Sequence, residues 1–147
     1  MPGIGSIAEA SARAALHDVP VAAQPKRIIV GFDGSDGARR ALDAATQLMG
    51  YGSTLTVVNV SPDGEPTATD ALAEAREWLL DRLVTASYVR RVGAAADELV
   101  ALAEELDADV IVVGRRGGAE DVSLRTDPGS VSADVVRRAA CDVLVVG

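Results

Sequence analysis

The sequence predicts an α/β fold, an open five-stranded parallel sheet with helices on both faces. Two observations carry this prediction. Short segments rich in Val and Ile alternate along the chain with longer segments whose apolar residues recur at helical spacing. The short segments are apolar at successive positions rather than at every second one, which is typical of strands buried on both faces of a parallel sheet.

The expected elements follow one another without a break that would indicate a second domain. The strands are expected at residues 27–31, 54–60, 88–92, 109–113 and 142–146. The first helix follows a cap at Ser35 or Asp36 and ends before Gly50. The later helices are expected at residues 69–83, 97–106 and 130–140. Arg90 and Arg91 make the third strand polar, which favours a place at an edge of the sheet.

Helical spacing also predicts which side chains face the core. Leu83 is expected to close the apolar face of the helix at 69–83, and Leu106 that of the helix at 97–106. Trp78 is expected to pack rather than to bind a ligand. Cys141 is the only cysteine, which excludes an internal disulfide, and it is expected to pack as a small apolar residue.

The composition is that of a globular domain with an acidic balance. The 147 residues are 48% hydrophobic, and the formal net charge is −8 with Lys26 as the only lysine. We therefore expect neither nucleic acid nor a membrane as a partner. Residues 1–25 are rich in Ala, Gly, Ser and Pro and are expected to form a flexible arm before a single domain at 26–147. This arm lacks a signal-peptide pattern and no apolar run reaches about 18 residues, so a cytoplasmic location is expected.

Glycine-containing loops follow the first and the fourth predicted strand. One runs from Gly31 to Gly37 and includes Asp33, and the other runs from Gly114 to Gly129 and leads into a helix. Ligands of open parallel sheets bind beyond the strand C-termini, where glycines let a phosphate approach backbone N–H groups and a helix N-terminus. If the two strands are neighbours, both loops flank one crevice, and a phosphate or nucleotide site is predicted there. Asp33 either contacts the ligand or only forms the turn.

Several catalytic and nucleotide-binding patterns do not occur in the sequence. There is no G-x-x-x-x-G-K-[ST], and the segment from Gly31 does not match the dinucleotide fingerprint G-x-G-x-x-G. The only histidine, His17, lies in the expected arm, so the domain offers no Ser–His or Cys–His pair. We therefore predict no catalytic residue and no metal held by protein side chains.

Four segments resemble the universal stress protein family and occur in the order found there. They are Arg27–Ser35, Asp107–Gly117, Gly129–Ser132 and Ala140–Val146. The resemblance implies a Rossmann-like fold similar to that of adenine nucleotide alpha hydrolases, with strand order 3-2-1-4-5, and usually a dimer. One branch of the family binds ATP through G-x-x-G, nine residues and then G-[ST], whereas the other branch lacks this motif and does not bind ATP.

The resemblance also implies roles for particular residues. Asp33 would lie near the ribose and adenine, and Leu55 would contact adenine from the second strand. Gly31 and Gly118 belong to the same two loops and are candidates with them. The phosphates would be surrounded by Gly114, Gly117, Gly129, Ser130 and Val131.

The second loop departs from the family pattern in length and charge. Eleven residues separate Gly117 from Gly129, or ten if the motif starts at Gly118. Three of these residues are acidic and would repel phosphate if they point inward. Arg115 and two other arginines in or beside the loop would offset these charges and make Arg115 a candidate phosphate contact.

Together these features predict a regulatory module of the stress response that binds ATP or another adenine nucleotide, with or without Mg²⁺, with slow or no hydrolysis. The alternative is a nucleotide-free universal stress protein that acts as a structural dimer through protein contacts. An efficient ATP-cleaving enzyme is the least supported. In the implied strand order the apolar strand at 142–146 lies at an edge, which predicts a homodimer formed through this strand.

Overall fold

The computed structural model describes residues 24–64, 67–115 and 130–147. The expected arm lies outside these residues except at its end, and so does nearly all of the loop from Gly114 to Gly129. In the described part of the chain five strands alternate with four helices, as predicted. The strands are β1 (Arg27–Gly31), β2 (Thr54–Ser61), β3 (Ser87–Val92), β4 (Val110–Gly114) and β5 (Asp142–Val146). The helices are α2 (Asp36–Leu48), α3 (Thr67–Asp81), α4 (Ala95–Leu106) and α5 (Ser130–Arg138).

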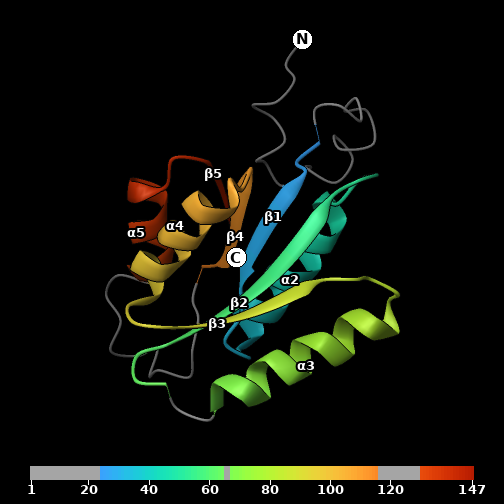
Figure 1. Ribbon diagram of the computed structural model, residues 1–147, viewed down its shortest axis with the longest axis horizontal. Coiled ribbons are helices and arrows are strands. Elements are labelled where there is room, and N and C mark those ends of the chain that lie inside the picture. The colour runs from blue at the N-terminus through green and yellow to red at the C-terminus, as the bar shows by residue number, and fades with distance from the viewer. Residues whose placement is uncertain (1–23, 65–66, 116–129) are drawn as a thin grey trace.

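The strands form one parallel sheet in the order β3-β2-β1-β4-β5 (Figure 1). β1 lies at the centre, where Val30 is paired with Val57 of β2 on one side and with Val112 of β4 on the other. The chain first winds outward from β1 through β2 to β3, and then crosses back to β4 and β5. The predicted fold class and strand order are thus confirmed.

Helices cover both faces of the sheet and bury two apolar cores (Figure 1). Ile28 and Val30 of β1 face α2 and α3, whereas Ile29 between them faces α4 and α5. This alternation is the ordinary pleat of a strand. Since each of these side chains meets a helix layer on its own face, the strand is apolar at three successive positions, Ile28 to Val30, and this explains the continuous apolar runs in the sequence.

Local signals set the start of α2. The Ser35 hydroxyl oxygen accepts a hydrogen bond from the Ala38 N–H at 3.1 Å, so Ser35 rather than Asp36 is the N-cap. Asp36 lies in the first turn, where the helix dipole favours a carboxylate. The predicted inward face is confirmed by the burial of Ala38, Ala41, Leu42, Ala45 and Leu48.

The end of α3 corrects one prediction and confirms another. Leu83 does not face the core but is 93% exposed, because α3 ends at Asp81 and Leu83 takes a left-handed conformation with φ of 59°. This turn lets the Val84 N–H donate to the Leu79 carbonyl at 2.9 Å, and Val84 packs on the core instead. Trp78 packs on the same core as predicted, and the Arg82 guanidinium lies 3.5 Å from the centroid of its ring.

The end of α4 gives a similar correction. Leu106 is 38% exposed rather than inward. It is the last residue of the helix, and Asp107 after it adopts φ of 56° and turns the chain toward β4. Leu99 and Leu102, which lie within the helix, are buried as predicted.

Candidate functional site

β1 and β4 are adjacent, so the two glycine-containing loops leave the sheet from the same edge. The register pairs Ile28 with Val110 and Val30 with Val112, so the two strands end at the same edge, and a Cβ atom on Gly31 would lie 3.7 Å from a methyl carbon of Val113, the residue before Gly114. The winding direction of the sheet also reverses between these two strands. In open α/β sheets such a reversal is where ligands bind, beyond the strand C-termini. The expectation that the first and fourth strands are neighbours is confirmed.

The turn after β1 is held by hydrogen bonds at both of its ends. The Phe32 N–H donates to the Val58 carbonyl at 2.8 Å and prolongs the β1–β2 ladder. The Asp33 carboxylate accepts from the Ser35 N–H at 3.0 Å, and Gly34 adopts φ of +84°, which glycine takes without strain. The turn-forming role of Asp33 is thus confirmed. The Asp33 side chain is exposed, and its second oxygen has no hydrogen bond to a described residue.

Packing explains why Gly114 carries no side chain. A Cβ atom there would lie 2.7 Å from the Gly37 carbonyl oxygen and 2.8 Å from the Gly37 carbonyl carbon, in the first turn of α2. At Gly31, a Cβ atom would lie 3.3 Å from a methyl carbon of Leu99 on α4. Helices from both faces of the sheet therefore come close to the ends of β1 and β4, and Gly114 has no room for a side chain unless the backbone of α2 moves.

Two arginines lie at the β5 side of this edge. The Arg115 N–H donates to the Val146 carbonyl at 2.7 Å, and a Cβ atom built on Gly147 would lie 3.7 Å from a terminal nitrogen of the Arg115 guanidinium. Arg40 of α2 donates from Nε to the Gly147 carbonyl at 3.1 Å. Both side chains are exposed and bring positive charge to the end of β4 and β5.

The N-terminus of α5 lies at the same edge of the sheet. α5 ends at Arg138, just before β5 begins at Asp142, so its first residue, Ser130, is at the opposite, carboxyl edge. Val131 in its first turn is 40% exposed. The candidates Gly117, Gly118 and Gly129 lie outside the residues that the structure describes.

Leu55 is not at this edge, and its assignment to the site is corrected. The register pairs Leu55 with Ile28 near the start of β1, whereas Gly31 pairs with Val58. Leu55 is 2% exposed and belongs to the core beneath α2 and α3. The residue that β2 places beside the turn is Asn59, which sequence reasoning missed. A polar residue within an apolar strand is the signal that points to it.

The α3 side of the turn is bordered by an ion pair. Arg39 Nε lies 2.6 Å from Glu74 Oε2, and Arg39 also contacts Asp36 at 2.8 Å. The hydrogen bond with Glu74 raises the pKa of Arg39 above its ordinary value. Glu74 reaches the turn itself, since a Cβ atom on Gly34 would lie 3.7 Å from Glu74 Oε1. The pair therefore links α2 and α3 next to Asp33.

Cys141 is half-buried against the core beneath α4 and α5, as predicted, and burial raises the pKa of its thiol. In residues 24–64, 67–115 and 130–147, no group of three or more His, Cys, Asp and Glu side chains is placed to hold a metal ion. None of the helices described is both long enough and apolar enough to cross a membrane.

Comparison with known proteins identifies the family. The model of the universal stress protein family matches residues 25–147. A universal stress protein of Mycobacterium tuberculosis is 36% identical over 141 residues, which cover 82% of this chain and 95% of that protein. The solved structure of a universal stress protein in complex with cAMP superposes with a TM-score of 0.70 at 30% identity, over 85% of this chain and 99% of that one. A universal stress protein from Lactobacillus plantarum shares the fold, with a TM-score of 0.68 at 23% identity over 85% of this chain and 99% of that one. The chain belongs to the universal stress protein family.

Proposed function

We propose that this universal stress protein is a regulatory module of the stress response that binds ATP or another adenine nucleotide, with slow or no hydrolysis. The observation that supports this most is the arrangement at the carboxyl edge of the sheet. The Asp33 turn, the ends of β1 and β4, and the start of α5 all lie at this edge. The relative of similar fold that is in complex with cAMP supports an adenine nucleotide as the ligand.

In the proposed complex the nucleotide lies across the ends of β1 and β4. The Asp33 oxygen that the turn leaves free accepts a hydrogen bond from the ribose. The phosphates bind at the loop containing Gly117, Gly118 and Gly129 and at the first turn of α5, whose backbone N–H groups have no partner within the helix. Arg115 contributes positive charge at the phosphate end, and Mg²⁺ enters with ATP rather than through a site made of protein carboxylates.

Calorimetric titration tests the proposal. Two or three charge-assisted contacts of about 1.5–3 kcal/mol each, with burial of adenine, support a Kd in the micromolar range, or about 8 kcal/mol. ATP and cAMP are titrated, with and without Mg²⁺, into the unchanged protein and into Asp33→Asn. The asparagine retains an acceptor for the Ser35 N–H but loses the carboxylate charge, so we expect ATP affinity to fall about 10- to 100-fold.

Asp36→Asn is the matched control, because it removes a charge from the same region without altering the turn. It is expected to leave the Kd nearly unchanged. A Kd weaker than about 1 mM for every adenine nucleotide, roughly 4 kcal/mol, would exclude the proposed ligand. Turnover of ATP at or above about 1 s⁻¹ would instead indicate an enzyme.

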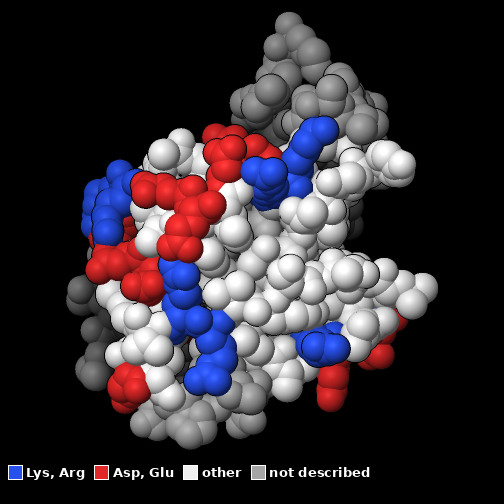
Figure 2. All heavy atoms as spheres, in the orientation of Figure 1, with Lys and Arg blue, Asp and Glu red and all other residues white. Residues whose placement is uncertain are grey.

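A second candidate function is a nucleotide-free homodimer that acts through protein contacts. The exposed edge of β5 favours it, because Val145 is 37% exposed in a strand whose only charged residue is Asp142. A dimer through β5 is compatible with either function, and we propose that it forms in both cases, in the cytoplasm. Acidic and basic side chains lie side by side on the face shown in Figure 2, and the formal net charge of −8 further supports our expectation that nucleic acid is not a partner.

A further inference from the structure

Asn59 lies at a position of β2 where the alternation of the strand predicts a buried apolar residue. Leu55 and Val57 face the core beneath α2 and α3, and the pleat of the strand turns Asn59 to the same face. Asn59 is only 5% exposed. A carboxamide buried at such a position needs a hydrogen-bond partner, because the water that it leaves behind has to be replaced.

The partner of Asn59 is the backbone of the Asp33 turn. Asn59 Nδ2 donates to the Phe32 carbonyl oxygen at 2.9 Å, and this bond is buried. The regular ladder between β1 and β2 ends just before, where the Phe32 N–H donates to the Val58 carbonyl. Phe32 itself is 3% exposed, so its carbonyl would be deprived of both water and a strand partner without Asn59.

We propose that Asn59 is a positioning residue for the nucleotide site, holding the peptide from which the Asp33 carboxylate is presented. This inference rests on the proposed function. Asp33 follows the peptide that Asn59 holds, and on its other side Ser35 is fixed by the bond from its N–H to Asp33 and by its cap on α2. Only Asp33 and Gly34 lie between these two fixed points, and Gly34 is the more flexible of the two.

The first test measures the turn in the nucleotide-free protein. Asn59→Leu preserves the approximate size of the side chain but removes the donor to the Phe32 carbonyl. We expect amide hydrogen exchange at Ser35 to become about tenfold faster, since its N–H is bonded to the Asp33 side chain. Leu79→Ala is the control for general loss of stability, because Leu79 is fully buried near the end of α3, at the opposite edge of the sheet. When denaturant is adjusted so that both variants have the same free energy of unfolding, Leu79→Ala is expected to leave the exchange rate of the Ser35 amide unchanged.

The second test is a double-mutant cycle that measures whether the hydrogen bond from Asn59 to the Phe32 carbonyl affects ATP binding. Asn59→Leu is expected to weaken ATP binding about tenfold in the unchanged background and less than about twofold in Asp33→Asn, because both changes act on the same contact. A merely structural residue would weaken binding equally in both backgrounds, and that result would overturn the proposal. So would unchanged ATP affinity in Asn59→Leu.

The two tests separate this inference from the proposed function. If the unchanged protein binds no adenine nucleotide, the proposed function fails and the positioning role for nucleotide fails with it. Faster exchange at Ser35 in Asn59→Leu would then still show that the hydrogen bond from Asn59 to the Phe32 carbonyl stabilises the Asp33 turn, without a role in nucleotide binding. If the protein binds ATP and Asp33→Asn weakens it, the proposed function stands, and the double-mutant cycle by itself decides the role of Asn59.

Discussion

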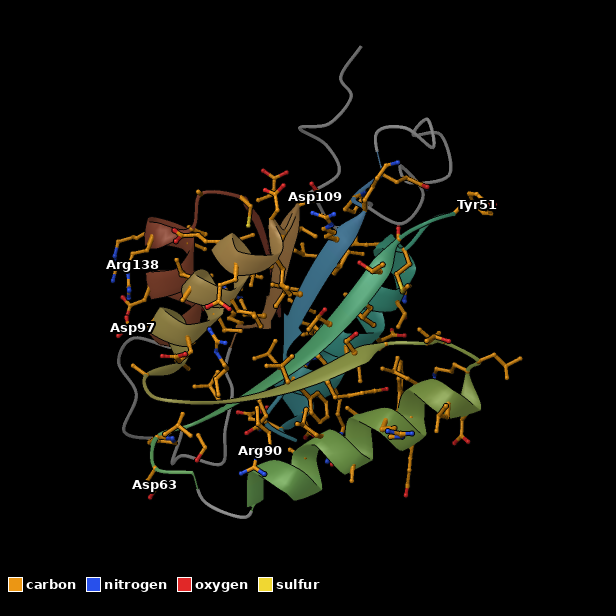
Figure 3. The ribbon with its side chains drawn as sticks, in the orientation of Figure 1. Tyr51, Asp63, Arg90, Asp97, Asp109 and Arg138 are labelled. Carbon is orange, nitrogen blue, oxygen red and sulfur yellow. The ribbon has the colours of Figure 1, made fainter. Side chains whose placement is uncertain are left out.

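The two outermost strands of the sheet, β3 and β5, differ in whether they carry charged or apolar side chains. β3 carries Arg90 and Arg91, and β5 carries Val143, Leu144, Val145 and Val146 (Figure 3 labels Arg90). Arg91 lies across the neighbouring helix, with Nε 3.1 Å from Glu98 and Nη2 2.6 Å from Glu105 of α4. None of the side chains of β5 makes an ion pair with another described residue.

This difference indicates that the two edge strands differ in their tendency to pair with a strand of another molecule. An edge strand offers unpaired N–H and C=O groups to any other strand, and charged side chains are a common means of preventing such pairing. At β3 the guanidinium of Arg91 is fixed over α4, and Val92 is the only strongly exposed apolar side chain of the strand. β5 lacks this protection, so we expect association through β5 and not through β3.

The largest expected effect comes from placing the same charge on each edge. Val145→Lys puts two ammonium groups into a two-fold interface through β5, and burying unpaired charge costs several kcal/mol. We expect the dimer dissociation constant to rise more than about 100-fold, or about 3 kcal/mol. Val92→Lys on β3 is the matched control and should leave it unchanged. Sedimentation equilibrium over a range of concentrations measures both, and a monomeric unchanged protein at tens of micromolar would refute association through β5.

A smaller effect is expected from removing the protection of β3. Arg91→Val, made in the Val145→Lys protein, removes the ion pairs with Glu98 and Glu105 and leaves Arg90 as the only charged residue of the edge strand. Light scattering should then show an apparent mass that increases with protein concentration. Arg91→Lys, which retains a charge on the strand, should remain monomeric. If Arg91→Val is also monomeric up to about 100 µM, in the range of weak non-covalent association, the charge is not what protects this edge.

The smallest effect concerns acid stability. The hydrogen bond from Arg91 lowers the pKa of Glu105 below its ordinary value of 4.5. The stabilisation that ionised Glu105 gives the folded state is therefore complete above about pH 4.5, and it is lost as the pH falls through the lowered pKa of the folded state. Glu105→Gln should be slightly less stable than the unchanged protein at pH 7, and this difference should shrink below pH 4. Glu104→Gln is the control, because Glu104 makes no ion pair with a described residue. Urea unfolding at several pH values measures the effect, and parallel pH profiles for Glu105→Gln and the unchanged protein would contradict it.

Local patterns in the sequence were sufficient for most of the fold. Continuous apolar runs predicted most of the strands because both faces of the sheet are covered, and a cap at Ser35 or Asp36 predicted the start of α2. The ends of helices were less predictable. Helical spacing extended α3 as far as Leu83, but the chain leaves the helix in a left-handed turn, and Val84 reaches the core instead. Spacing identifies an apolar face but not the residue at which the chain stops following it.

The candidate site shows the same limit at larger scale. The sequence by itself determined that glycines and Asp33 follow two strands, because the chemistry of turns and of anion binding acts over a few neighbouring residues. Only the tertiary structure decided that β2 contributes Asn59 and not Leu55, since the register between β1 and β2 sets which residue reaches the edge. It also decided that Gly114 must lack a side chain because the backbone of Gly37 lies against it. Such contacts join segments far apart in the chain, and they depend on the packing of whole layers, which no local pattern specifies.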